Sequence, residues 1–174
     1  LPEFGAVEVL ADHDAEGNLY TYRPTNPPTM RQLLSHTAGF AYGNRTSTLI
    51  DQRMLDMHLM DAPTSDALIS QLATLPYARA PGSEWQYSIA SDLQGAIIER
   101  LTGETLNAFL KREVFDPLGM ADTGFYVAAD KLNRLSDVTQ RSGPGLIDAD
   151  LEAADKLTRS KSFFRGGDGL FSTQ

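Results

Sequence analysis

The 174-residue sequence contains no cysteine. Without thiols it can form no disulfide, no thiolate nucleophile and no thiolate metal site. It also lacks long apolar runs, since none approaches the roughly 20 residues that a helix needs to cross a bilayer. Histidine is scarce, and His13, His36 and His58 form no His-x-x-x-His pair. The residues therefore indicate neither a membrane span nor a metal site.

Positive charge is in deficit. Lys and Arg number 15 against 23 Asp and Glu, which gives a formal net charge of −8. Because cationic side chains supply most of the affinity for phosphate backbones, this balance argues against nucleic-acid binding. With 41% apolar residues the chain can still bury a core, and its length fits one domain or a large piece of one.

Two serine-nucleophile motifs are missing. The sequence has no Gly-x-Ser-x-Gly elbow, which disfavours an α/β-hydrolase, and no Ser-x-x-Lys. By itself the chain therefore shows no activated serine. The N-terminal residues 1–4 include no initiator Met and no signal-peptide pattern, so we expect an internal portion of a longer protein. The residues leave open the oligomeric state and the compartment, cytoplasmic or periplasmic.

Apolar spacing and capping residues predict five helices, which makes the chain mostly helical over residues 29–120. The helices are expected at 29–39, 49–59, 64–75, 91–103 and 105–117. A sixth, short and acidic, is expected at 148–160. Strand-like patterns occur as a hairpin around residues 16–18 and at 125–127 and 135–139. With no βαβ alternation, the fold class is α+β with minor strands, and a doubly wound sheet is disfavoured.

The glycine-rich segment 166–169 suggests a phosphate-binding loop as one alternative. A P-loop needs Lys followed by Ser or Thr directly after the glycines, whereas here Leu170 and Phe171 follow. The segment instead predicts a tight turn in which backbone approaches backbone. His36, at the expected end of the first helix, could be a base or a ligand. Its position favours a histidine that hydrogen-bonds backbone.

Three segments carry a family pattern. Residues 30–40, MRQLLSHTAGF, resemble an LLxHTSGL stretch; residues 81–123 resemble PGxxWxYS…LGxIIExxTG…PLGMxDT; and residues 166–173 are similar to GGGGLxST. Together they resemble the β-lactamase-like serine hydrolases, which comprise class C β-lactamases, D-alanyl-D-alanine peptidases, and related carboxylesterases and lactonases. The long middle string is highly specific. Residues 1–4 are similar to the family's PEF-like stretch.

The resemblance implies a β-lactamase/transpeptidase-like fold, of which residues 1–174 would form an internal portion of one catalytic domain. In this family a Ser-x-x-Lys helix comes first and a Lys-Thr-Gly or His-x-Gly strand comes last, and this chain would lack both. It also implies a catalytic role for Tyr87. A phenol with an ordinary pKa of about 10 is a poor base at neutral pH, but a nearby lysine ammonium favours the phenolate. Tyr87 would then take the serine proton as general base during formation of an acyl-enzyme.

One departure from the family pattern concerns the substrate. Lactamases and peptidases of the group usually have Tyr-x-Asn, whose amide contacts the substrate, whereas here Ile89 stands at the third position. An apolar side chain cannot make those hydrogen bonds, which places the chain closest to the esterase and lactonase branch. Ester or lactone hydrolysis is the leading hypothesis. The alternatives are a β-lactamase or D,D-peptidase, and a non-catalytic penicillin-binding-like module.

Further substrate-binding candidates beside Ile89 are Tyr42 and Trp85, for which core packing is the alternative. The methionines Met54, Met57 and Met60 are interpreted as core filler. The expected partner is a small-molecule ester, lactone or β-lactam, and no cofactor is expected.

Overall fold

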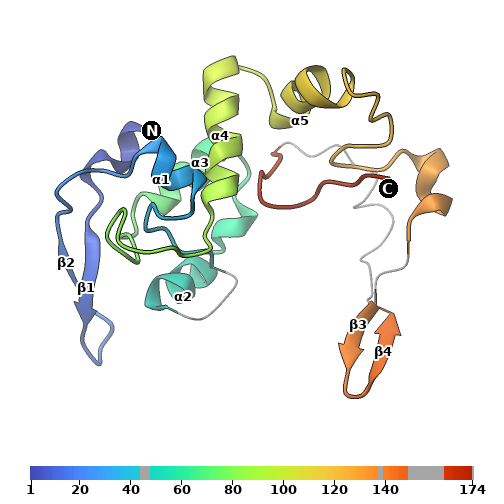
Figure 1. Ribbon diagram of the computed structural model, residues 1–174. Coiled ribbons are helices and arrows are strands. Elements are labelled where there is room, and N and C mark those ends of the chain that lie inside the picture. The colour runs from blue at the N-terminus through green and yellow to red at the C-terminus, as the bar shows by residue number, and fades with distance from the viewer. Residues whose placement is uncertain (44–47, 137–138, 149–162, 174) are drawn as a thin grey trace. The chain divides into compact units, whose positions relative to one another are not determined.

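The computed structural model of the chain describes residues 1–43, 48–136, 139–148 and 163–173. It divides into two compact units, Leu1–Phe109 with Ser162–Asp168, and Leu110–Lys161 with Gly169–Gln174. In the described residues the five expected helices are present. They are α1 (Met30–Leu34), α2 (Leu49–Asp56), α3 (Ser65–Leu72), α4 (Ala90–Thr102) and α5 (Leu106–Leu110) (Figure 1).

Side-chain caps explain where the first three helices begin. Thr29 and Thr48 each form a capping box with the residue three positions on, and Thr64 accepts a hydrogen bond from the backbone of Ala67. Helix α4 begins slightly earlier than its Ser91-Asp92 signal indicated, with Ile89 at its N-cap position and no side-chain cap. It ends as expected, at Gly103 with φ of 72°.

The core of the first unit forms where α1 and α3 pack against α4. Beneath them the rings of Phe4 and Tyr77 meet Phe40 edge-on, with centroids 5.1 and 5.2 Å away. The buried Tyr77 hydroxyl donates to the Phe4 carbonyl at 2.9 Å, and burial raises the pKa of Tyr77 well above its ordinary value. These contacts hold the N-terminal 3₁₀ helix Pro2–Ala6, which the sequence did not predict, on the core.

The first expected hairpin is confirmed, because β1 (Val9–His13) and β2 (Leu19–Tyr22) pair antiparallel across a turn at residues 14–18. In the second unit the strand expected at 125–127 is wrong. Of the strand expected at 135–139, residues 137–138 lie outside the described residues, and Thr139 is the first residue of β3 (Thr139–Ser142), which pairs with β4 (Gly145–Asp148). Residues 125–127 have no ladder partner: the chain makes an isolated bridge at Gly124 and turns into the 3₁₀ helix Ala129–Arg134.

Two further expectations concern the acidic helix and the three methionines. The acidic helix expected at 148–160 falls almost wholly outside the described residues. Met54 is buried as core filler, but Met57 is exposed and Met60 only half-buried.

After α5 the chain continues as a π-helical turn, Lys111–Phe115, which carries the buried Phe115.

Gly39 lies where the loop after α1 meets the segment that follows Tyr77. Its carbonyl accepts from the backbone N–H groups of Ala78 at 2.8 Å and Arg79 at 3.2 Å. Its φ of 90° is one that side chains disfavour, and a Cβ here would lie 2.1 Å from the Arg79 carbonyl oxygen. Only glycine fits this crossing without moving backbone.

Substituting Gly39→Ala is therefore expected to lower the free energy of unfolding by about 3 kcal/mol, since φ strain adds to a backbone clash. Urea denaturation checks this. The matched control is Gly5→Ala, where a new Cβ meets nothing within 4 Å and φ is not positive. The control should stay within about 0.5 kcal/mol. Equal stabilities for the two variants would contradict the role assigned to Gly39.

Candidate functional site

Two loops far apart in the sequence, residues 36–41 and 78–89, are joined by backbone hydrogen bonds in the first unit. N–H groups of the second loop donate to carbonyls of the first: Gly82 to Thr37 at 2.7 Å, Gln86 to His36 at 2.9 Å and Ile89 to Ala41 at 3.0 Å. Tyr87 lies between the last two of these bonds. Its backbone is thereby fixed without belonging to a helix or strand.

His36 occupies the turn at the end of α1 with φ of 55°, a left-handed conformation that is uncommon for a residue with a side chain. Its Nδ1 accepts from the backbone N–H of Ser88 at 3.3 Å and lies 3.2 Å from the Ser88 hydroxyl. Because a backbone N–H can only donate, Nδ1 carries the lone pair and the ring proton is on Nε2. The interpretation of His36 as a backbone-binding histidine at a helix end is confirmed.

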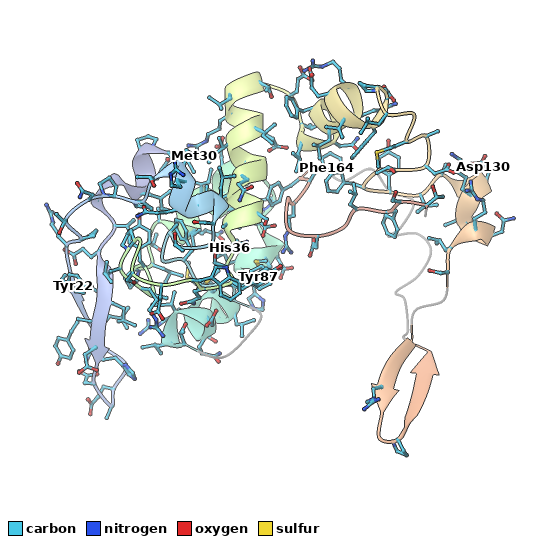
Figure 2. All side chains as sticks on the ribbon, in the orientation of Figure 1. Tyr22, Met30, His36, Tyr87, Asp130 and Phe164 are labelled. Atoms are coloured by element: carbon cyan, nitrogen blue, oxygen red, sulfur yellow. The ribbon has the colours of Figure 1, made fainter. Side chains whose placement is uncertain are left out.

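The ring of Tyr87 packs between two other rings. It stacks on His36, with centroids 5.1 Å apart and planes at 24° (Figure 2). It also meets Tyr42 edge-on, at 5.1 Å and 71°. The side chain remains 39% exposed. Tyr87 is thus held in one orientation by its neighbours while part of it stays open to solvent or a substrate.

Tyr42 is positioned by Asp51 in the first turn of α2. The Oδ1 atom of the buried Asp51 accepts from the backbone N–H groups of Tyr42 and Gly43, both at 3.0 Å, while its Oδ2 accepts from the backbone and hydroxyl of Thr48. Burial raises the pKa of Tyr42, and the nearby Asp92 carboxylate raises it further. Tyr42 is therefore held as a neutral phenol against Tyr87.

The other two substrate-binding candidates lie in opposite environments. Trp85 is 66% exposed, with its ring 6.3 Å from that of His36, so the alternative of core packing is wrong for it. Ile89 has no exposed surface at all and packs in the core. A direct contact between Ile89 and a substrate would need surface that this side chain does not have, so any influence on specificity would be indirect.

A buried ion pair that the sequence did not predict adjoins these residues. Arg165 Nε donates to Asp92 Oδ1 at 2.9 Å, and Gly167 N–H donates to the same oxygen at 3.3 Å. A Cβ on Gly166 would lie 2.1 Å from the Ser91 carbonyl oxygen, so the turn at 166–169 does bring backbone against backbone, as expected. No signal in the sequence linked Asp92 to Arg165.

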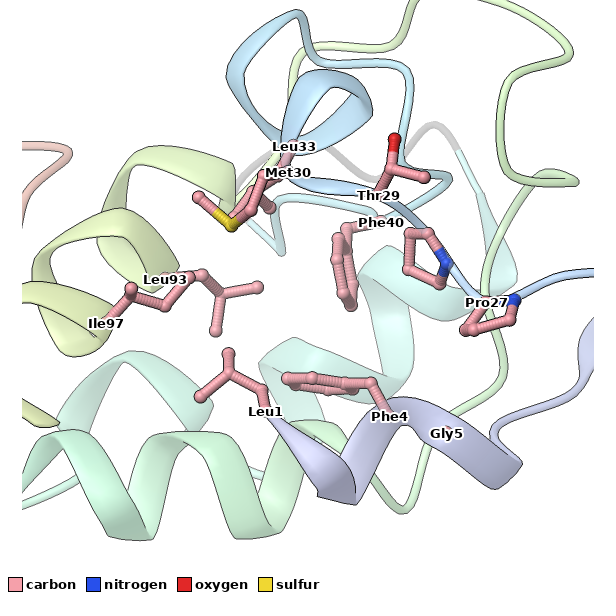
Figure 3. Close-up of a pocket in the computed structure, with 11 residues that line it drawn as sticks. Leu1, Phe4, Gly5, Pro27, Thr29, Met30, Leu33, Phe40, Leu93 and Ile97 are labelled. Carbon is pink, nitrogen blue, oxygen red and sulfur yellow. The ribbon is translucent and has the colours of Figure 1, made fainter. Parts of the chain in front are cut away.

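An apolar pocket of about 260 Å³ lies elsewhere in the first unit (Figure 3). Its lining comes from the N-terminal turn, the 27–33 segment, the loop after α1 and α4, and includes Leu1, Phe4, Met30, Phe40 and Ile97. It contains no titratable side chain, so it offers no group for chemistry. Among the described residues, no cluster of three or more His, Asp or Glu could hold a metal ion, and no helix is long and apolar enough to span a membrane.

A family model described as Beta-lactamase matches residues 11–174. The chain belongs to this family. The family's fold and the resemblance noted in the sequence are thereby confirmed.

Its relatives in the family include esterases and acyltransferases. The chain is 30% identical over 175 residues to lovastatin esterase of Penicillium rubens, and 33% identical over 175 residues to monacolin J acid methylbutanoyltransferase of Aspergillus terreus. These matches cover 99% of this chain but 43% and 41% of the relatives. A structure of simvastatin synthase (LovD) from Aspergillus terreus matches with a TM-score of 0.77 and 31% identity, over 99% of this chain and 42% of that one.

The role of His36 can be tested by His36→Ala. Loss of Nδ1 leaves the Ser88 N–H without its acceptor, so the free energy of unfolding should fall by about 2 kcal/mol in urea denaturation. His58→Ala is the matched control, because His58 shares the left-handed backbone with φ of 49° while its side chain is 81% exposed. If both variants lost the same stability, the effect would belong to the backbone and not to the contact with Ser88.

Proposed function

We propose that this chain forms the tyrosine-bearing part of a longer serine hydrolase that cleaves carboxylic esters or lactones through an acyl-enzyme. The observation that carries the proposal is Tyr87, an exposed phenol held rigidly by His36 and Tyr42 within the segment that matches the family. The esterase and acyltransferase relatives support the choice of acyl chemistry.

In the proposed reaction, Tyr87 is the general base. Its phenolate takes the proton from a serine hydroxyl as the oxygen attacks the ester carbonyl, and the phenol then returns a proton to the departing alkoxide. Water attacks the acyl-enzyme in the second half of the reaction and releases the acid. The serine and the lysine that would favour the phenolate are expected as a Ser-x-x-Lys sequence N-terminal to Leu1. The 174-residue chain by itself is expected to be inactive.

Ile89 favours esters over amides only indirectly. The asparagine usual at this position in lactamases and peptidases of the family offers an amide group, whereas the fully buried Ile89 side chain offers neither a hydrogen-bonding group nor a surface. Since an unsatisfied substrate amide loses affinity, amides should be the poorer substrates. Hydrolysis of β-lactams or D-alanyl peptides remains the second candidate, and a non-catalytic penicillin-binding-like module the third.

Trp85 and Tyr42 are proposed to contact the substrate on either side of Tyr87. Trp85 exposes a large aromatic surface next to His36, which suits the apolar part of an ester. Tyr42 touches the catalytic ring itself and presents little surface. Its contribution is to orient Tyr87 and to bound the space beside it.

The catalytic assignment predicts that Tyr87→Phe in the full-length protein lowers kcat for a short-chain p-nitrophenyl ester by about 10²- to 10⁴-fold, because proton transfer is lost. Stopped assays of the purified variants measure this, with unfolding curves to confirm an intact fold. Tyr22→Phe, on the exposed face of β2, should keep full activity. Wild-type turnover in Tyr87→Phe would refute the assignment, and nitrocefin cleaved faster than the ester would favour the lactamase alternative.

If Trp85 contacts the substrate, Trp85→Ala should change the kinetic constants in a different way from Tyr87→Phe. Its KM for an ester with a bulky apolar group should rise about 3- to 10-fold while kcat changes little, because only binding surface is removed. Stability should be unchanged, since the side chain is mostly exposed. Tyr22→Ala, which removes another exposed aromatic side chain, serves as the control. An unchanged KM would remove Trp85 from the substrate site.

A further inference from the structure

Only one of the two ring nitrogens of His36 has a partner in the described part of the chain. Nδ1 accepts from the Ser88 backbone N–H at 3.3 Å and lies 3.2 Å from the Ser88 hydroxyl. Nε2 makes no hydrogen bond to any described residue. Because the lone pair of Nδ1 is taken up by a backbone donor, the ring proton is on Nε2, from which it can be donated.

The Nε2–H group is not sealed inside the protein. Among the described residues, the buried side-chain polar atoms without a partner are Glu3 Oε2, Gln71 Oε1 and Asp92 Oδ2. Nε2 of His36 is not one of these atoms, and the residue as a whole is half-buried. The partnerless N–H therefore reaches the surface, where water or a bound molecule can accept from it.

The surface that it reaches is that of the candidate site. The ring of Tyr87 stacks on His36 at 5.1 Å (Figure 2), and the ring of Trp85 meets His36 edge-on at 6.3 Å and 60°. Trp85 and Tyr87 are 66% and 39% exposed. A molecule that covers Trp85 and reaches Tyr87 therefore comes close to the imidazole of His36.

The direction of this N–H group is fixed by contacts on the other side of the residue. The His36 carbonyl accepts from Gln86 N–H at 2.9 Å, and the bond from Ser88 determines which edge of the ring faces that residue. A donor that is already oriented loses little conformational entropy when a ligand binds. The neighbouring side chains offer no substitute, because the Ser88 side chain is buried and Ile89 is apolar.

We propose that His36 is a substrate-binding residue, whose Nε2–H donates a hydrogen bond to an acceptor oxygen in the part of the ester or lactone that covers Trp85. The substrate class is thereby narrowed to esters or lactones whose apolar portion carries an ether, hydroxyl or carbonyl oxygen. One nitrogen of His36 serves the fold and the other serves the ligand. The inference rests on the proposed function, since it takes the substrate to lie on Trp85 and Tyr87.

The experiment measures the binding of ketones to the full-length protein by isothermal titration calorimetry. Each ketone has a CH₂ group in place of the bridging ester oxygen, so it cannot be hydrolysed. The ketones form pairs, in which an ether oxygen replaces one further CH₂, and this oxygen is moved stepwise along both arms. The quantity compared between variants is the ratio of the Kd of the plain ketone to that of its ether partner.

Two variants separate the two nitrogens. The amide oxygen of His36→Asn is as many bonds from Cβ as Nδ1, and asparagine tolerates the left-handed backbone. This variant should keep the wild-type urea midpoint, while for at least one pair the Kd ratio falls about 3- to 10-fold, the effect of one neutral hydrogen bond. The amide nitrogen of His36→Gln corresponds to Nε2, so this variant should keep most of the ratio and unfold at lower urea concentration.

His58→Asn is the matched control. His58 shares the left-handed backbone, with φ of 49°, but its side chain is 81% exposed and it lies outside the two joined loops. Its Kd ratios should equal those of the wild type for every pair.

The proposal is overturned if His36→Asn gives the wild-type Kd ratio for every pair of ketones. Should His36→Asn fail to fold, the wild-type protein decides: the NMR signal of the His36 Nε2–H proton should move downfield with an ether ketone and not with its plain partner, and a signal that stays in place with every ether ketone overturns the proposal. Ester turnover by Tyr87→Phe is assayed separately. If that variant is inactive while the ratios do not change, only the role of His36 fails; if it is active, the proposed function fails.

Discussion

The site depends on the backbone contact between residues 36–41 and 78–89. Hydrogen bonds at both ends of this contact fix the loop on which Tyr87 stands, and the crossing at Gly39 is so close that a side chain would strike the Arg79 carbonyl. Loop residues are usually mobile because they lack a ladder or helix to satisfy their backbone groups. Here the backbone groups of the two loops hydrogen-bond to each other. An irregular segment is therefore held in place much as a helix or strand would be.

His36 completes this arrangement with one side chain. Its left-handed backbone directs the ring toward Ser88, where Nδ1 accepts a buried N–H that would otherwise lack a partner. The face of the same ring supports Tyr87. A single histidine therefore joins the end of α1 to the loop that carries Tyr87.

Local signals in the sequence predicted the helices well, because threonine caps and the glycine at position 103 act within a few residues. The strand expected at 125–127 did not form, since a strand forms only where a partner strand exists, and that is not a property of the local sequence. Tyr87 was found through an ordered motif, but nothing in that motif signalled that Ile89, a substrate-binding candidate, is fully buried. Arg165 and Asp92, separated by 73 positions, carry no local signal of their pairing.

The environment of Tyr42 favours its neutral form. Burial and Asp92 raise the pKa of Tyr42, and the one opposing contribution comes from Arg165, which is already paired with Asp92 and Asp168. In the proposed site, this chain would hold the Tyr87 ring in place through its loop contacts and its packing on His36. The lysine of a Ser-x-x-Lys motif would then favour the phenolate. Such a division would couple activation of Tyr87 to assembly of the complete site, because an ordinary phenol becomes a base only when the lysine is present.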